Sequence, residues 1–283
     1  MKKRIALPTD FSKNAWNACA YAFELFKDEE CIFYIVNAYE VKSYALGDMM
    51  VPEPGQEGYE RAAQISSNGL HKILDMIDFR NENSKHSFET ISELNSPMEA
   101  LKQLIEKKDI DMVVMGTKGA TNSRAAILGS NAVMAMEHIR NCPVLAVPAE
   151  AQFEGVKEIV FPTSFKTHYK RRELEYLTDI AQHHNATIAV VHVDKDEELS
   201  SSQEENKELL LDRLEGVEVA FHHLRGSNPT DAVFHFVESR KSDLIAFVNK
   251  KHLFFGSIFT NPMVKELGMY SKVPLLALHD LRN

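Results

Sequence analysis

The residues best suited to chemistry in this 283-residue chain are glycines that follow a short apolar strand. Val113–Met115 runs into Gly116, and then come two residues, Gly119, nine residues, and the pair Gly129-Ser130 before a helical stretch over 131–140. Glycines let a backbone approach a ligand without an intervening Cβ. A Gly-Ser pair at a helix start directs free N–H groups and the positive end of the helix dipole outward. This pattern predicts a phosphate-binding loop.

The spacing G-x2-G-x9-G-S matches the ATP-binding signature of universal stress proteins without a mismatch, and the chain resembles that family. The resemblance implies that ATP binds here, with or without Mg2+. It implies that Asp10 contacts the ribose or a bridging ion, that Ala38 packs against adenine, and that Met115 and Gly116 approach the nucleoside. The full set of implied binding residues is Pro8, Thr9, Asp10, Ala38, Met115, Gly116, Lys118, Gly119, Gly129, Ser130 and Asn131.

Several of these assignments have a simpler alternative. Asp10 or Ser12 could do no more than cap the helix that follows them. Lys118 and Arg124 could neutralise phosphate, but cations on exposed loops are common. Asn131 differs from the small or hydroxyl residue usual at its position in the family, which leaves its contact open.

The elements around the glycines alternate between strand and helix. We expect strands at 5–10, 32–38, 86–94, 113–115 and from Pro143, and helices at 14–26, 62–77, 98–107 and 131–140. Residues 40–58 include Pro52, Pro54, Gly55 and Gly58 and are expected to form a loop. Such alternation predicts an α/β fold with a doubly wound, Rossmann-like parallel sheet, in which ligands bind at the carboxyl ends of the strands.

The second half of the chain repeats the framework of the first. Residues 157–165 correspond to 3–11, Asn228-Pro229 to Ser96-Pro97, and 273–278 to the last strand of the first half. We therefore expect two tandem domains, residues 1–149 and 150–283. The resemblance implies that they pair through the strands 144–147 and 275–278. The polar run 194–207 is expected to be a flexible connection.

The chemistry is not repeated with the framework. Aligned on Asp111 and Asp243, Gly116 becomes Val248 and Gly119 becomes Lys251. Aligned on Pro143 and Pro274, Gly129-Ser130 becomes Thr260-Asn261. Asp10 becomes Ser164. We expect the second domain not to bind ATP in the family manner.

Composition and charge restrict the class of protein. The formal charge is −9 and no basic stripe is present, which disfavours nucleic acid as a partner. No apolar run is long enough for a membrane helix, and the three cysteines lack metal-ligand spacing, so we expect a cytoplasmic protein with reduced, buried thiols. The pairs His183-His184 and His222-His223 diverge too far to chelate one ion, and His192 is expected to be a core or pocket-wall histidine.

Three functions are compatible with the sequence. The first is an ATP-binding stress-response protein whose nucleotide state is read by a protein partner, with a homodimer left open. The second is a slow ATPase or self-phosphorylating enzyme, although no general base is evident beside the γ-phosphate. The third is a scaffold or a carrier of a small molecule or lipid, in which the second domain binds a ligand near Val248, Phe254, Phe255 and Phe259. Side chains filling the vacated cleft are the simpler alternative to that ligand.

Overall fold

The computed structural model describes residues 2–41, 55–80, 83–117, 130–194, 198–226, 228–249 and 272–279. In the first half the elements are β1 (Lys3–Pro8), α1 (Lys13–Leu25), β2 (Cys31–Tyr39), α2 (Glu57–Arg80), β3 (His86–Leu94), α3 (Pro97–Lys108), β4 (Met112–Gly116), α4 (Ser130–His138) and β5 (Val144–Val147). In the second half they are β6 (Glu158–Pro162), α5 (Arg171–His184), β7 (Thr187–Asp194), α6 (Ser201–Arg213), β8 (Val219–Arg225), α7 (Pro229–Arg240), β9 (Leu244–Asn249) and β10 (Leu275–His279).

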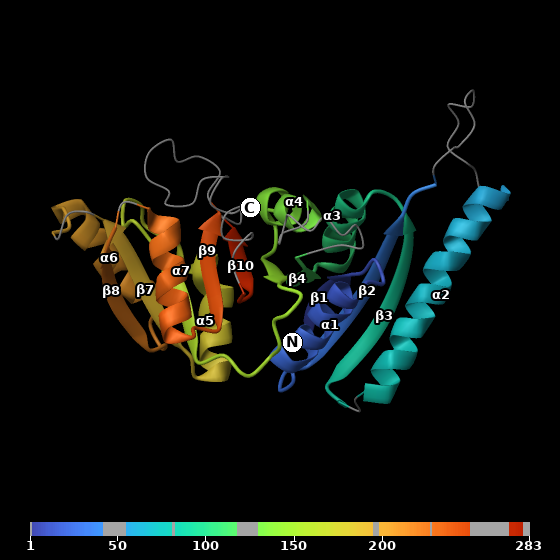
Figure 1. Ribbon diagram of the computed structural model, residues 1–283, viewed down its shortest axis with the longest axis horizontal. Coiled ribbons are helices and arrows are strands. Elements are labelled where there is room, and N and C mark those ends of the chain that lie inside the picture. Colours follow the sequence, from blue (N-terminus) through green and yellow to red (C-terminus); the bar gives the residue numbers. More distant parts are fainter. Residues whose placement is uncertain are drawn as a thin grey trace, which may run out of the picture.

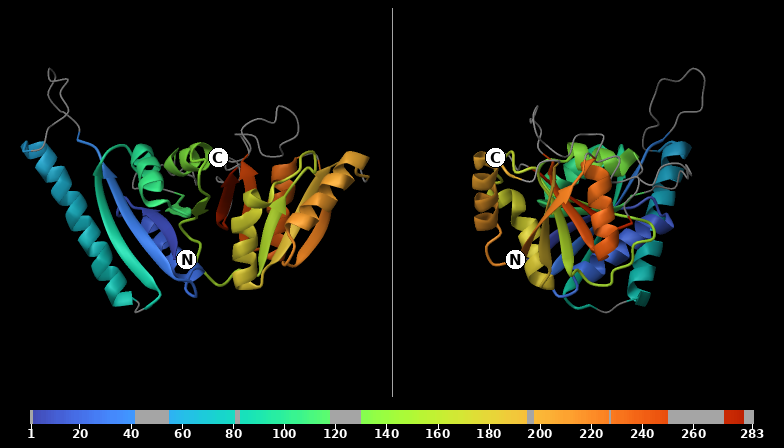
Figure 2. Two further views of the ribbon diagram at one scale, coloured as in Figure 1. Left: turned by 180° about the vertical axis from the view of Figure 1, so that it is seen from behind. Right: turned by 60° about the vertical axis from the view of Figure 1, so that its left-hand side comes forward.

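The strands form one sheet in the order β3-β2-β1-β4-β5-β10-β9-β6-β7-β8. All neighbours are parallel except β5 and β10, which are antiparallel, with Ala146 opposite Leu275 and Val144 opposite Ala277. The expected α/β fold is confirmed. Figure 1 shows the two halves side by side, with β10 near the middle and α2 and α6 at opposite ends; Figure 2 shows the same arrangement from behind.

Each face of the sheet carries one apolar core that continues through both halves. Residues of α1, α2, α5 and α6 pack with Leu7, Phe33 and Phe161 on one face. Residues of α3, α4 and α7 pack with Ala6, Val36 and their neighbours on the other face. Strands buried on both faces need apolar residues at successive positions, which explains runs such as Val113-Val114-Met115.

The helices α3 and α7 begin with the same kind of cap. Ser96 caps α3 and accepts a hydrogen bond from Glu99 N, and Pro97 is the first helical residue. Asn228 caps α7 and accepts from Thr230 N at 3.0 Å, and Pro229 follows it. A capping side chain followed by proline suits a helix start, because proline lacks the N–H that would have no partner there.

The expectation of a flexible connection over 194–207 is wrong for residues 201–207, which belong to a helix. Ser201–Arg213 is the helix α6, which begins with a capping box between Ser200 and Gln203. Its low apolar content misled the composition argument, because only Leu210 of this helix is fully buried. The helix is fixed instead by polar contacts, in which Gln203 Nε2 donates to Ser164 O at 2.9 Å and Asn206 Nδ2 donates to Phe165 O at 2.8 Å.

Candidate functional site

The sheet of the first half opens between β1 and β4. These strands pair only at Ile5–Met112 and Ala6–Val113. Further along, β1 stays with β2, since Thr9 N donates to Val36 O at 2.9 Å, and β4 stays with β5, since Thr117 N donates to Val147 O at 3.0 Å. β2 and β3 lie on one side of β1 while β4 and β5 lie on the other, so this crevice is the topological switch point.

Three of the residues predicted to contact the nucleoside, Pro8, Ala38 and Met115, lie on the same face of the sheet beside this crevice. Ala6, Val36 and Met115 belong to the core under α3 and α4. Because side chains two residues apart on a strand share a face, Pro8 and Ala38 lie on that face as well. Ala38 is half-buried at the end of β2, whereas Met115 is buried.

The first turn of α4 lies at the same edge of the sheet. α4 connects β4 to the parallel strand β5, so its N-terminus is at the carboxyl ends of these strands. Ser130 is its first residue, and Asn131, the second, is exposed. A helix N-terminus offers N–H donors and positive potential to an anion. Lys118, Gly119 and Gly129, and the side chain of Ser130, lie outside the described residues.

Asp10 lies in a turn that its own side chain helps to form. Thr9 Oγ1 accepts from Phe11 N at 3.0 Å, and Asp10 Oδ1 accepts from Ser12 N at 3.0 Å. Ser12 is the N-cap of α1, with Oγ accepting from Ala15 N at 3.1 Å. Of the two alternatives for a cap, Ser12 is therefore the capping residue. Asp10 shapes the turn and leaves an exposed carboxyl group at the edge of the crevice.

Gly116 has a packing role that the sequence did not reveal. A Cβ at this position would lie 2.8 Å from Nδ2 and 2.9 Å from Cγ of Asn14, in the first turn of α1. The missing side chain therefore lets α1 approach β4 closely. Next to it, Thr117 is buried, and its hydroxyl has no hydrogen-bond partner within the described part of the chain. Asn14 and Thr117 were missed as site residues, although a polar residue directly after an apolar strand is a usable signal.

The corresponding edge of the second half has the same turn, but different side chains pack beside it. Thr163 Oγ1 accepts from Phe165 N at 3.1 Å, and Ser164 Oγ accepts from Lys166 N at 3.4 Å. Tyr169 follows, with its hydroxyl 3.1 Å from Thr163 Oγ1 and its ring 5.3 Å from Phe161; burial raises the pKa of Tyr169 to about 12. α1 begins four residues after Thr9, whereas α5 begins eight residues after Thr163. Val248, the counterpart of Gly116, has a buried side chain.

The cysteines and a cluster of possible metal ligands have structural roles. Cys19, Cys31 and Cys142 are free and buried, as expected, and burial raises the pKa of each thiol to about 12. Glu29, Asp179 and His183 are close enough to hold a cation, but the Lys3 ammonium group binds both carboxylates. That cluster joins β1 to α5 across the two halves.

Within the described residues, no helix is long and apolar enough to cross a membrane.

A doubly wound α/β sheet with a crevice at its switch point, bordered by a helix N-terminus, defines a class of ligand-binding α/β proteins. A profile of the universal stress protein family matches residues 1–148, just over half of the chain. The chain therefore belongs to the universal stress protein family.

Two curated relatives each match about half of the chain. Universal stress protein MJ0577 of Methanocaldococcus jannaschii is 28% identical over 158 residues, covering 52% of this chain and 95% of the relative. Universal stress protein MJ0531 of the same organism is 26% identical over 155 residues, covering 51% and 81%.

Solved structures match the whole two-half fold. A universal stress protein of Archaeoglobus fulgidus has a TM-score of 0.70 at 16% identity and covers 98% of both chains. A protein of Pseudomonas aeruginosa described as a putative universal stress protein has a TM-score of 0.63 at 10% identity, covering 98% of this chain and 93% of that one. At these identities the likeness shows the fold alone.

Proposed function

We propose that the first half binds ATP in the crevice between β1 and β4, and that the protein acts as a nucleotide-dependent regulator in the stress response. The observation that carries this proposal is the opening of the sheet at Thr9 and Gly116, directly beside the N-terminus of α4. Adenine would lie against Pro8, Ala38 and Met115, which share one face.

The polar parts of the nucleotide fit the two sides of the crevice differently. The exposed carboxyl group of Asp10 suits a ribose hydroxyl or a bridging Mg2+, because it would repel phosphate. The phosphates would lie at the first turn of α4, held by Ser130 and Asn131 together with Gly119, Gly129 and Lys118 of the preceding loop. ATP is then a ligand that biases the state of this loop, and a protein partner reads that state.

We propose one nucleotide site for each chain. At the corresponding edge of the second half, the hydroxyl of Tyr169 lies 3.1 Å from Thr163 Oγ1, and Val248 carries a buried side chain where the first half has Gly116. Its counterpart of Asp10 is Ser164, which has no negative charge.

The test is a matched pair of variants, Asp10→Ala and Ser164→Ala, measured by calorimetric titration with ATP after exhaustive dialysis. Each removed side chain accepts a hydrogen bond from the amide two residues later, at 3.0 Å for Asp10 and 3.4 Å for Ser164, so both substitutions remove the same kind of turn contact. Asp10→Ala should weaken ATP binding by about 10–100-fold, the usual effect of losing one charged hydrogen-bond partner. Ser164→Ala should leave the affinity unchanged, with one ATP bound per chain.

Two outcomes would overturn the proposal: equal ATP affinity in Asp10→Ala and wild type, or two equivalent sites per chain. Gly129→Val is a suitable second variant, because the glycine signature places Gly129 at the phosphates. Gly116→Val is not, because any side chain at Gly116 displaces Asn14 and confounds binding with stability.

We also propose a cellular compartment and a class of partner for the protein. Buried, unpaired thiols fit a reducing compartment, so we place the protein in the cytoplasm. The net charge of −9 argues against nucleic acid as a partner. The antiparallel pairing of β5 with β10 already joins the two halves within one chain.

A further inference from the structure

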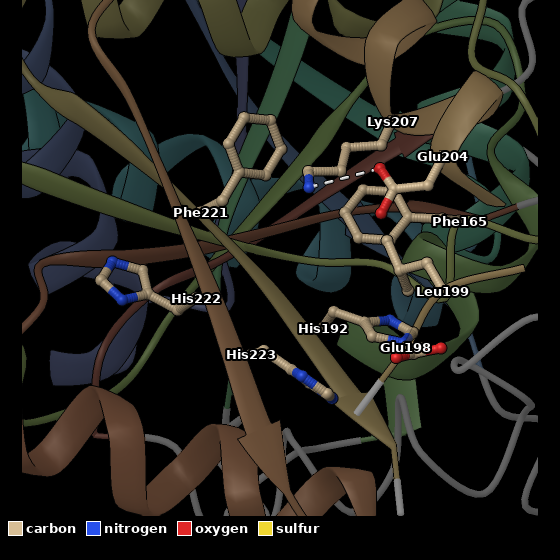
Figure 3. A pocket seen from close by; sticks show the side chains of 9 residues that line it. All are labelled: Phe165, His192, Glu198, Leu199, Glu204, Lys207, Phe221, His222 and His223. Carbon is tan, nitrogen blue, oxygen red and sulfur yellow. Dashed lines mark ion pairs between the residues drawn. The ribbon is translucent and has the colours of Figure 1, made fainter. Parts of the chain in front are cut away.

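The second half contains a pocket that is separate from the proposed nucleotide crevice. It measures about 550 Å³ and lies between α6, the end of β7 and β8. Figure 3 shows the residues around it, with Lys207 directed toward Glu204. Val191 and Val193 face the core under α7, so His192 between them points to the other face, toward α6. Val193, on the opposite face, is the residue that corresponds to Ala38 of the proposed nucleotide site, so this pocket is not the counterpart of that site.

His192 Nε2 makes no hydrogen bond within the described residues, and its charged neighbour is the Asp194 carboxylate, whose Oδ2 lies 3.9 Å away. The His192 side chain is 94% buried (6% exposed), and its Nδ1 lies 2.9 Å from Thr163 O. A carbonyl oxygen can only accept, so Nδ1 donates this hydrogen bond, and in the neutral form of an imidazole Nε2 is then an acceptor. Nε2 is buried and makes no hydrogen bond to any described residue, and a buried acceptor in this condition is costly.

Two phenylalanine rings, Phe165 and Phe221, form the apolar part of the pocket wall beside His192. The Phe165 ring lies 5.2 Å from the His192 ring and 6.3 Å from the ring of Phe221, which is itself 37% exposed. The hydrogen bonds from Gln203 and Asn206 to the 164–165 backbone fix α6 over this site. The pocket is therefore preformed and does not need to be induced.

The charge of the pocket limits what can enter it. Glu198 and Glu204 line it together with Lys207, whose Nζ lies 3.5 Å from Glu204 Oε2 and 5.4 Å from the centre of the Phe221 ring. With one ammonium group already paired to one of two carboxylates, a phosphate or carboxylate ligand would be repelled.

We propose that this pocket binds a small planar aromatic molecule without negative charge. Its ring lies beside Phe165 and Phe221, and its O–H or N–H group donates to His192 Nε2. The apolar walls supply the affinity, and the orphan acceptor supplies the specificity, because a ligand lacking the donor leaves Nε2 unsatisfied. The site stands independently of ATP binding in the first half.

In the described residues of the first half, the positions that correspond to His192 and Phe165 are filled differently. There, Asn37 replaces His192 and donates through Nδ2 to Thr9 O at 2.7 Å, which leaves no ring nitrogen to satisfy. Phe11, the counterpart of Phe165, packs against Gly69 of α2, a helix of 24 residues compared with 13 in α6.

Indole and 1-methylindole test the proposal, because they share one ring system and differ in the N–H donor. Dissociation constants are measured by ligand-observed NMR on the full chain without nucleotide, for wild type, His192→Asn, Phe221→Ala and Phe79→Ala. Wild type should bind indole about tenfold more tightly than 1-methylindole, the usual effect of one hydrogen bond. His192→Asn should abolish that difference, and Phe221→Ala should weaken both ligands.

Phe79→Ala is the matched control, because Phe79 is 95% exposed on α2 and both ligands should bind this variant as they bind wild type. Leu199→Trp, which fills the pocket and keeps His192, covers the case in which His192→Asn unfolds; it should remove binding. Equal affinity of wild type for the two indoles, or no indole binding below about 1 mM, would overturn the proposal. Failure of the Asp10→Ala test would leave these results unaffected.

Discussion

The ring of Phe11 occupies the space that a side chain on Gly69 would need. A Cβ at Gly69 would lie 2.3 Å from Cζ of Phe11, so α2 carries a glycine in the middle of a long helix to receive this ring. Phe11 itself has a φ of 63°, a left-handed conformation that costs a non-glycine residue about 1–2 kcal/mol. The contact thereby holds the turn that carries Thr9 and Asp10 against α2.

We predict that Gly69→Ala destabilises the protein by about 1–3 kcal/mol, although alanine favours helix by about 1 kcal/mol. The new methyl group must displace the Phe11 ring, so the Asp10 turn should shift and ATP affinity should fall with stability. Urea unfolding and ATP titration of the same variant measure both effects.

Gly58→Ala is the matched control, because a Cβ at this helical position meets only Val41 Cγ1 at 3.6 Å. It should be neutral or slightly stabilising and should leave ATP binding unchanged. If Gly69→Ala were as stable as Gly58→Ala, the proposed role of the Phe11–Gly69 contact would be wrong.

A second prediction concerns Gly116 and Asn14. Gly116→Ala should cost about 1–3 kcal/mol of unfolding free energy, because the methyl group would overlap the Asn14 side chain. In an Asn14→Ala background the same substitution should cost less, since the two closest side-chain atoms are gone, while the Asn14 backbone oxygen at 3.0 Å remains. A double-mutant cycle by urea unfolding gives the coupling energy. Strictly additive effects would show that the two residues do not interact.

These two contacts mark where the sequence stops being informative. The alternation of elements predicted the α/β fold, and it predicted a helix over 98–107 that matches α3 to within one residue at each end. The pattern could not show that Gly116 accommodates Asn14 or that Gly69 accommodates Phe11. Each pair joins residues far apart in the chain, and only packing brings them into contact.

The second half shows the same limit from another side. The polar composition of 194–207 concealed α6, since this helix depends on a capping box and on two side-chain amides rather than on a continuous apolar stripe. His192 was recognised as a pocket-wall or core residue, and its burial confirms this. Its unsatisfied Nε2, however, follows only from the position of Thr163 O.

A third prediction concerns the ion cluster between the halves. Lys3→Met keeps the apolar part of the side chain over Phe26 but leaves the carboxylates of Glu29 and Asp179 without their cation. All three side chains are less than a third exposed, so we expect a loss of about 1–3 kcal/mol of stability. Lys102→Met removes the exposed pair with Glu99 and should change stability by less than about 1 kcal/mol. Comparable losses in the two variants would argue against a special role for Lys3.

The last prediction is a loss of stability in acid that depends on His279 in β10. Burial, followed by the positive charge of Arg140, lowers the pKa of His279 to about 3 from its ordinary 6.5. Between these values the unfolded chain binds a proton that the folded chain does not. The contribution of His279 to stability is therefore complete above about pH 6.5 and falls by up to about 1.4 kcal/mol for each pH unit below it.

His279→Leu removes the titrating group and keeps an apolar residue in a strand position that is 2% exposed. Its advantage over wild type should grow as the pH falls from about 7 to about 4, because only the wild-type chain takes up that extra proton on unfolding. Urea unfolding at several pH values measures the difference between the two curves. A difference that stays constant across this range would mean that His279 is not responsible for the acid sensitivity, since steric and apolar effects of the leucine do not vary with pH.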